Sequence, residues 1–172
     1  MRQLDALSIS IGVLGGVATL MTATVLTIPV WVIFIAWASF FILGAGTDGM
    51  MRSIASNLTG IVIASLTLLV IHALGDGTVV AAVAVGVGSA AMVQASKVPL
   101  LSRIPAIVWG FASTVGTVAA TGHGITTASI NNPALVAALS MVLGAVFGIA
   151  SEYWGAAMTE RRAAEPTPEG QS

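Results

Sequence analysis

Long apolar runs, separated by short polar breaks that carry glycine or proline, make up nearly the whole chain. An α-helix needs about 20 mostly apolar residues to cross a bilayer. Backbone groups in lipid must be paired within their own segment, so we expect these runs to be membrane-spanning helices. Six runs qualify, some of them a little short. They are Ser8–Thr27, Pro29–Ala45, Ser53–Leu74, Thr78–Ala95, Ile104–Thr121 and Pro133–Tyr153.

The basic residues test this count of six spans. With six spans, the N-terminus, the 46–52 loop, the 97–103 loop and the C-terminus share one side of the membrane. That side carries every Lys and Arg of the chain, namely Arg2, Arg52, Lys97, Arg103, Arg161 and Arg162. The positive-inside rule makes this side cytoplasmic. A five- or seven-span count would scatter these charges, so we predict six spans with both termini in the cytoplasm.

Composition agrees with a membrane protein. Of the 172 residues, 56% are hydrophobic and 8% are charged, whereas a soluble domain has about a quarter of its residues charged. We therefore predict an all-α membrane domain over residues 1–158, in contact with the lipid bilayer. The polar tail, residues 159–172, is expected to be disordered in the cytoplasm. The net charge of −1 argues against a nucleic-acid partner.

The chain also contains a weak internal repeat. Shifting it by 76 positions places Ile28–Pro29 on Ile104–Pro105 and Gly46 on Gly122. Each unit, about 7–76 and about 83–155, would hold three spans, and an odd number of spans inverts the second unit relative to the first. The predicted fold is therefore two inverted three-helix repeats. Two similar hydrophobic blocks without a common origin are the alternative.

A polar group stands directly before the sixth apolar run. Asn131 and Asn132 precede Pro133; asparagine is a favoured N-cap, and proline is tolerated in a first helical turn. An Asn-Pro-Ala sequence also invites comparison with water channels, where it caps half-helices in mid-membrane. Because a full span follows Pro133, we predict a simple N-cap. The matching group, Ser53–Asn57, is expected to start the third span.

Three stretches carry a family resemblance. They are VQASKVPLLSRIPAIVWGFAST (93–114), VWVIFIAWASFF (30–41) with GMMRSIASNLTG after it, and LGAVFG (143–148). Together they resemble the YcdZ-type family of small bacterial inner-membrane proteins, whose function is unknown. The resemblance covers nearly the whole chain before the tail and implies a bacterial inner membrane. It implies no activity and no catalytic residues. SNLTG and NNPAL also resemble, over a short length, helix starts of bacterial urea channels.

The interior of the predicted bundle is polar but uncharged. No acidic or basic residue falls at the middle of a span, whereas proton- or cation-coupled transporters use a membrane-embedded carboxylate. This favours a passive path for a small neutral solute. Hydroxyl and amide groups can replace the hydrogen bonds of such a solute with water, although packing between helices is an alternative role for each of them. The candidate binding residues are Trp37, Ser39, Asn57, Gln94, Ser113, Asn131 and Asn132.

His72 and His123 are the two histidines, and both are expected near the outer face. Histidine changes its charge near neutral pH, so the pair is a candidate for gating an outer mouth. The alternative is that each is an ordinary interface residue. A metal site would need further ligands, and we expect neither a metal nor another cofactor.

Glycines four residues apart give two spans small faces for close helix contact. Gly12 with Gly16, and Gly144 with Gly148, could join spans within one subunit or join subunits into a homo-oligomer. No Gly-x-Ser-x-Gly-like nucleophile turn is paired with a histidine on a facing helix, so intramembrane proteolysis finds no support. An enzyme is not expected.

Three functions remain open on the sequence alone. The first is a channel or facilitator for a small uncharged polar solute, urea- or amide-like. The second is a secondary transporter with the same inverted-repeat architecture. The third is a non-transporting structural or accessory membrane protein that works through its glycine faces and its tail.

Overall fold

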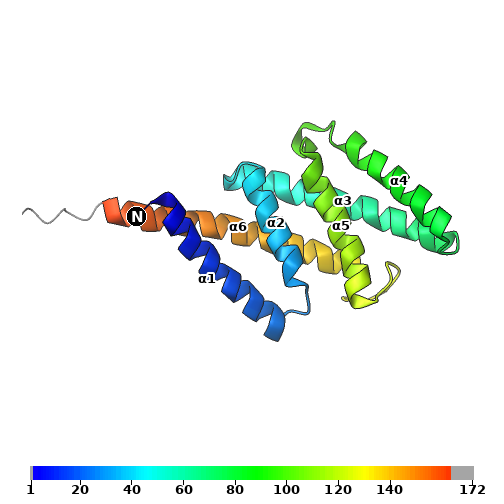
Figure 1. The fold of residues 1–172 in the computed structure, drawn as a ribbon, viewed down its shortest axis with the longest axis horizontal. Coiled ribbons are helices and arrows are strands. Elements are labelled where there is room, and N and C mark those ends of the chain that lie inside the picture. Colours follow the sequence, from blue (N-terminus) through cyan, green and yellow to red (C-terminus); the bar gives the residue numbers. More distant parts are fainter. Residues whose placement is uncertain (1, 164–172) are drawn as a thin grey trace, which may run out of the picture.

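The computed structural model describes residues 2–163, and the side chains of residues 2–159. Within these residues the chain is helical, with six α-helices and a short 3-10 turn (Figure 1). The elements are α1 (Gln3–Thr24), α2 (Val30–Ile42), α3 (Gly46–Ala73), α4 (Thr78–Ala95), η1 (Pro99–Leu101), α5 (Ile104–Thr121) and α6 (Pro133–Ala163). Each predicted run corresponds to one helix, and the bounds of α4 and α5 are those predicted.

Three helices extend beyond the predicted runs, and the first is α1, which begins at Gln3 rather than at Ser8. Helix α3 begins at Gly46, so the Ser53–Asn57 group lies inside this helix, and the prediction that it starts the span is wrong. Polar residues such as Asp48 can prolong a helix out of the lipid, and an acidic side chain in a first turn stabilises it. Helix α6 continues to Ala163, five residues into the predicted tail. The remainder of that tail, 164–172, lies outside the described residues.

Helix α2 is shorter than a membrane span. Its 13 residues give a length of about 20 Å at about 1.5 Å per residue, against about 30 Å of bilayer hydrocarbon. It follows Pro29, and it ends in a turn where Gly44 and Ala45 have φ of 109° and 58°. The other five helices are long and apolar enough to cross a membrane. Five of the six predicted spans are therefore confirmed as long enough, whereas α2 is shorter than its predicted run, Pro29–Ala45, and shorter than a full span.

The start of α6 is capped by an asparagine, as predicted. The Oδ1 atom of Asn132 accepts a hydrogen bond from the backbone N–H of Ala134 at 2.9 Å. Its Nδ2 atom donates to the carbonyl oxygens of Ile125 and Thr127, which fixes the preceding loop to the helix. Because α6 is 31 residues long, the half-helix alternative does not apply.

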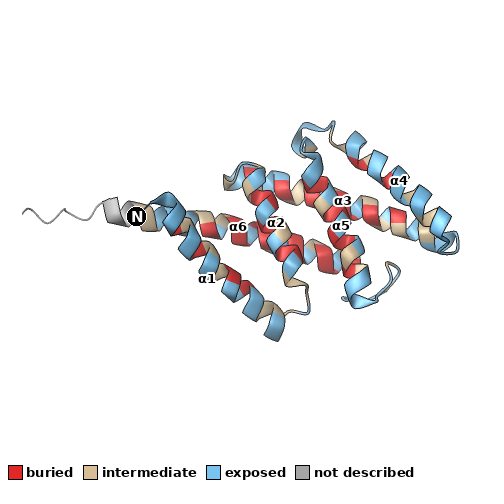
Figure 2. Cartoon of the chain, in the orientation of Figure 1, coloured by how far each residue is buried: buried red, intermediate tan, exposed pale blue. Residues whose placement is uncertain are grey.

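Four helices form the core, and two lie outside it. Helix α2 packs on α6, α3 packs on α5, and α3 and α6 also contact each other. Helix α1 lies mainly against α6, and α4 lies mainly against α3. Figure 2 shows buried positions concentrated on α2, α3, α5 and α6, whereas α1 and α4 are largely exposed. The core is completed by clusters of aliphatic and aromatic side chains between these helices.

Glycines bring the core helices unusually close. A Cβ atom on Gly60 of α3 would collide with the carbonyl oxygen of Ile107 on α5. A Cβ atom on Gly144 of α6 would collide in the same way with the carbonyl oxygen of Ile33 on α2. Small residues allow this kind of backbone contact between membrane helices. Both core helix pairs therefore depend on a glycine.

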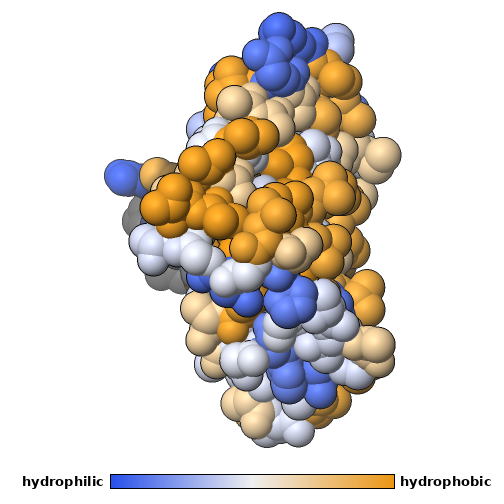
Figure 3. All heavy atoms as spheres, turned by 90° about the vertical axis from the view of Figure 1, so that its right-hand side faces the viewer, coloured by the Kyte–Doolittle hydropathy of each residue, from blue (hydrophilic) through white to orange (hydrophobic). Residues whose placement is uncertain are grey.

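The outer surface is that of an integral membrane protein. Large apolar side chains are exposed on every helix, such as Leu20 (64%), Val62 (57%) and Val83 (62%). Figure 3 shows a broad apolar band with hydrophilic groups above and below it. A soluble protein does not expose so much contiguous apolar surface. With five candidate spans, the chain is a multi-pass membrane protein.

Candidate functional site

A row of buried polar side chains connects α2 and α3. The Nδ2 atom of Asn57 donates to the Oγ atom of Ser53 at 3.2 Å, and Ser53 Oγ donates to Ser39 Oγ at 2.9 Å. All three residues are completely buried. Ser53 and Asn57 are four residues apart, so they lie on the same face of α3. Together with two further buried residues, Ser56, next to Asn57 in the sequence, and Ser113 of α5, we call this group the Asn57 cluster.

Close helix packing places α5 against this cluster. A Cβ atom on Gly110 of α5 would collide with the backbone of Asn57, so the two helices touch at this point. Ser113 lies about one turn further along α5 and is also completely buried. The cluster is therefore enclosed by α2, α3 and α5.

Three polar atoms of the cluster have no hydrogen-bond partner among the described residues. They are Ser56 Oγ, Asn57 Oδ1 and Ser113 Oγ. Leaving a buried polar atom unpaired costs about 1–3 kcal/mol. Other buried hydroxyl groups avoid this cost by donating to the carbonyl four residues earlier, as Thr114 and Ser140 do. The unpaired atoms set the Asn57 cluster apart from ordinary packing.

Trp37 belongs to a second polar group. Its indole N–H donates to Ser151 Oγ on α6 at 3.0 Å, and its ring stacks on Phe34 and contacts Phe147. Ser10 of α1 donates to the carbonyl oxygen of Ser151 at 2.9 Å. Residues two positions apart on a helix point about 200° apart, so Trp37 and Ser39 leave α2 on opposite faces. The structure does not bring Trp37 into the Asn57 cluster.

The sequence of the chain matches a known protein family. A family model described as "Protein of unknown function (DUF1097)" matches residues 8–156. The chain belongs to this family. The match includes the whole Asn57 cluster and Ser151. The match confirms that the chain belongs to a family of unknown function. It does not confirm the YcdZ name, which stays a resemblance. No curated protein and no solved structure matches the chain.

Other candidate residues of this DUF1097 protein lie away from the cluster. Gln94 is exposed on α4, because the buried stripe of that helix consists of Gly88 and Met92, and position 94 falls off it. Asn131 is exposed in the loop before α6, and Asn132 caps that helix. Of the predicted site residues, Ser39 and Asn57 are linked through Ser53, and Ser113 lies about one helical turn from the point where Gly110 meets Asn57.

Both histidines are exposed. The Nδ1 atom of His72 lies 3.6 Å from Asp76 Oδ2 just after α3, and these side chains are 62% and 68% exposed. His123 lies in the loop between α5 and α6. The hydrogen bonds and ion pairs described for these residues do not link the two histidines. Gating by the pair remains a prediction.

Only one of the two predicted glycine faces packs against another described helix. Gly144 and Gly148 of α6 pack within the chain against Ile33 and Phe40 of α2. They are buried, which agrees with the alternative that these glycines join helices within one subunit, and association of copies through them stays a prediction. Gly12 and Gly16 of α1 are exposed, and added Cβ atoms there would meet nothing within 4 Å.

A groove lies between α3 and α4. Its volume is about 530 Å³, and its lining is almost entirely aliphatic, from Leu74 and Val79 at one end to Gly88 near the other. Thr67 is the polar side chain in this lining. None of the predicted binding residues lines this groove, so it is separate from the Asn57 cluster.

Ser53, Ser56 and Ser151 were not identified as site residues from the sequence. Ser53 and Ser56 belong to a stretch interpreted as a helix start, although the four-residue spacing of Ser53 and Asn57 indicated a shared helical face. Ser151 carries no comparable signal, because its partner Trp37 is far away in the sequence.

Proposed function

We propose that this DUF1097 protein is a facilitator for a small uncharged polar solute that passes the Asn57 cluster. The observation that carries the proposal is the set of three unpaired buried atoms, Ser56 Oγ, Asn57 Oδ1 and Ser113 Oγ. Polar groups in the interior of a membrane protein are expensive and mark solute pathways. A solute that hydrogen-bonds to these atoms would remove the cost of leaving them unpaired.

The chemistry of the cluster favours a urea- or amide-like solute. Asn57 Oδ1 is an acceptor, because the Nδ2 atom of the same side chain already donates to Ser53. The hydroxyl groups of Ser56 and Ser113 can donate or accept. An amide offers N–H donors and a carbonyl acceptor, which matches this set. The cluster contains no charged side chain, which favours a neutral solute over an ion and transport over catalysis.

We also propose that the two halves are inverted repeats. Exchanging α1 with α4, α2 with α5 and α3 with α6 converts each main helix contact into another main helix contact. In Figure 1 a half-turn in the plane of the picture carries each helix close to its counterpart, with the chain direction preserved. Pseudo-symmetric halves of this kind are typical of transport proteins.

The glycine contacts refine the alignment of the repeats. Gly60 contacts Ile107, and Gly144 contacts Ile33. Under the proposed exchange of helices, this pairs Ile33 with Ile107 at a spacing of 74, and Gly60 with Gly144 at a spacing of 84.

The same two spacings pair buried hydroxyl residues with each other: Ser39 with Ser113, Ser56 with Ser140, and Thr67 with Ser151. The loop 122–132 is longer than the turn 43–45, which would account for most of the change in spacing and would explain why one ungapped shift of 76 positions aligns few residues.

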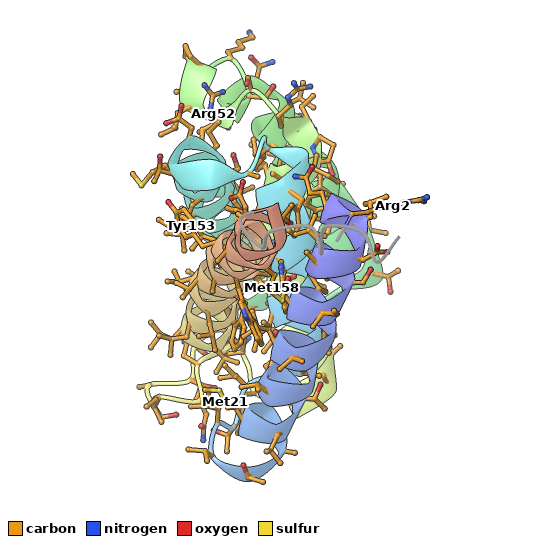
Figure 4. All side chains as sticks on the ribbon, turned by 90° about the vertical axis from the view of Figure 1, so that its left-hand side faces the viewer. Arg2, Met21, Arg52, Tyr153 and Met158 are labelled. Carbon is orange, nitrogen blue, oxygen red and sulfur yellow. The ribbon has the colours of Figure 1, made fainter. Side chains whose placement is uncertain are left out.

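The proposed location is a bacterial inner membrane with both ends in the cytoplasm. In Figure 1 the N-terminus, the α2–α3 turn and the α4–α5 connection lie toward the upper left, and the other three connections lie toward the lower right. In Figure 4, Arg2 and Arg52 lie toward the top and Met21, near the end of α1, toward the bottom. Basic groups gathered at one end favour a cytoplasmic position for it. We call it the basic end.

A secondary transporter is the second candidate, because the cluster is closed. Ser39, Asn57 and Ser113 are completely buried, so a solute reaches them only if helices move. Movement of one repeat against the other is how transporters of this architecture alternate access. Under this proposal an imposed proton or sodium gradient drives uptake above equilibrium, whereas a facilitator only equilibrates its solute.

Copies of the chain are proposed to associate through α1. Gly12 and Gly16 are exposed on one side of this peripheral helix and leave room for another helix. Glycines at this spacing allow close contact between membrane helices. Substituting both with valine should convert an oligomer to a monomer in native mass spectrometry.

Stopped-flow light scattering of proteoliposomes tests the proposed function. Urea, acetamide and glycerol would be compared, with empty liposomes as the background. Asn57→Leu preserves side-chain volume but removes the amide, and we expect it to lower urea or acetamide flux at least tenfold. Asn131→Leu is the matched control, since Asn131 is exposed in a loop. Wild-type flux equal to the background for every solute would sink the proposal.

A further inference from the structure

We infer that Glu152 and Ser151 form a latch that holds the basic end of the protein closed over the Asn57 cluster. Glu152 is then a positioning residue, because it acts through the first turn of α3 rather than by touching the solute. The inference rests on the proposed pathway, and it identifies the contacts that control access to that pathway.

Glu152 binds the start of α3. Its Oε2 atom accepts a hydrogen bond from the backbone N–H of Gly46 at 2.8 Å. Gly46 is the first residue of α3, where backbone N–H groups have no partner within the helix. A carboxylate is also favoured there because it meets the positive end of the helix dipole. Helix α6 thereby fixes the end of α3 that leads to Ser53 and Asn57.

Ser151, on the same turn of α6, binds two further helices. Its Oγ atom accepts from the indole N–H of Trp37 on α2, and its carbonyl oxygen accepts from Ser10 on α1. Ser151 Oγ also donates to Gly148 on its own helix at 2.7 Å. One turn of α6 thus holds all three helices of the first half by hydrogen bonds.

The corresponding turn of α3, toward the other end of the protein, has no such set of bonds among the described residues. Thr67, which pairs with Ser151 in the proposed repeat, donates only to the carbonyl oxygen of Ile63 on its own helix. Leu68 stands where α6 has Glu152. The aliphatic groove between α3 and α4 opens beside Thr67. The two ends are therefore closed unequally, and opening the basic end requires breaking the bonds of Glu152 and Ser151.

Thiol labelling tests the latch without measuring flux. The chain has no cysteine, so Ser53→Cys places a single thiol in the buried cluster, two turns into α3 from the latch. Labelling of this variant by N-ethylmaleimide in liposomes is followed by intact-protein mass spectrometry. We expect slow labelling with Glu152 present and labelling at least tenfold faster after Glu152→Ala. Trp37→Phe, which removes the bond to Ser151 but keeps an aromatic ring, should also accelerate labelling.

Two controls separate the latch from a general loosening of the fold. Asp48→Ala removes an exposed carboxylate from the same first turn of α3, and it should leave the labelling of Ser53→Cys unchanged. A single thiol at Thr117→Cys is buried near the far end of α5, and Glu152→Ala should not accelerate its labelling.

The labelling results distinguish the latch from the function. Unchanged labelling of Ser53→Cys after Glu152→Ala, or equal acceleration at Ser53→Cys and Thr117→Cys, would overturn the latch. A further outcome is that Glu152→Ala accelerates labelling at Ser53→Cys and not at Thr117→Cys while the wild-type protein gives the same solute flux as empty liposomes. That combination would support the latch and contradict the proposed facilitator.

Discussion

In the first half of the chain, Asn57, Ser53 and Ser39 form a hydrogen-bonded row between α2 and α3. Under the proposed relation between the halves, α6 has Met141 and Ala137 at the positions of Asn57 and Ser53. Ser113, which pairs with Ser39, is left without a hydrogen-bond partner among the described residues. The backbone contacts are alike in the two halves, whereas the side-chain chemistry is concentrated in the first. This difference shows that close helix packing and the buried hydrogen-bonded row depend on separate positions of the sequence.

The two outer helices, α1 and α4, also differ in how they are attached to the core. Helix α1 is held to α6 by the bond from Ser10, and Leu7 packs on Gly155. Helix α4 buries only Gly88 and Met92 against the rest of the protein and leaves a groove beside α3. Helix α1 is therefore fastened to α6 more firmly than α4 is fastened to α3.

Breaking the shared backbone contacts should have the largest effect. Gly60→Val and Gly144→Val each force a side chain into the backbone of the facing helix. Overpacking typically costs about 1–3 kcal/mol or more, and backbone atoms cannot move aside as side chains do. We expect both variants to lose the folded state or to lower Tm in detergent by similar amounts. Gly86→Val is the control, because a Cβ at Gly86 meets nothing within 4 Å. A large effect at only one of the two glycines would contradict the proposed equivalence.

Removing one buried hydroxyl group from each half should change the free energy of unfolding by a smaller amount, and by different amounts in the two halves. Ser39→Ala deletes the acceptor of the bond from Ser53 and should lower the free energy of unfolding by about 1 kcal/mol. Ser113→Ala deletes an oxygen without a partner among the described residues, so it should be neutral or stabilising. Unfolding in a denaturing detergent measures both. Equal losses for the two variants would mean that Ser113 has a bonding partner after all.

The smallest effect is expected in the groove. Ala84→Leu adds methyl groups that fill part of the space between α3 and α4, and it should stabilise the protein by about 0.5–1 kcal/mol. Ala82→Leu, on the exposed side of α4, is the matched control. A loss of stability after Ala84→Leu would indicate that the groove must stay open.

Much of the fold followed from the sequence, because hydrophobic runs and their breakers locate membrane helices well. The start of α6 was predictable, since Asn132 and Pro133 act locally. The early start of α3 was not, because it involves Glu152, which is distant in the sequence. The same limit applies to the site. Ser39 and Asn57 were identifiable as buried polar residues, whereas the separation of Trp37 from Ser39 became clear only from the helix faces and their partners.

If the proposed function holds, the absence of ionisable groups from the Asn57 cluster has an energetic consequence for the cell. Moving one elementary charge across a membrane potential of 100 mV is worth about 2.3 kcal/mol. A neutral solute that passes neutral side chains carries no current, so voltage neither drives nor opposes its passage. Electrical recording would then detect nothing, and the traffic through such a protein would follow osmotic and chemical gradients alone.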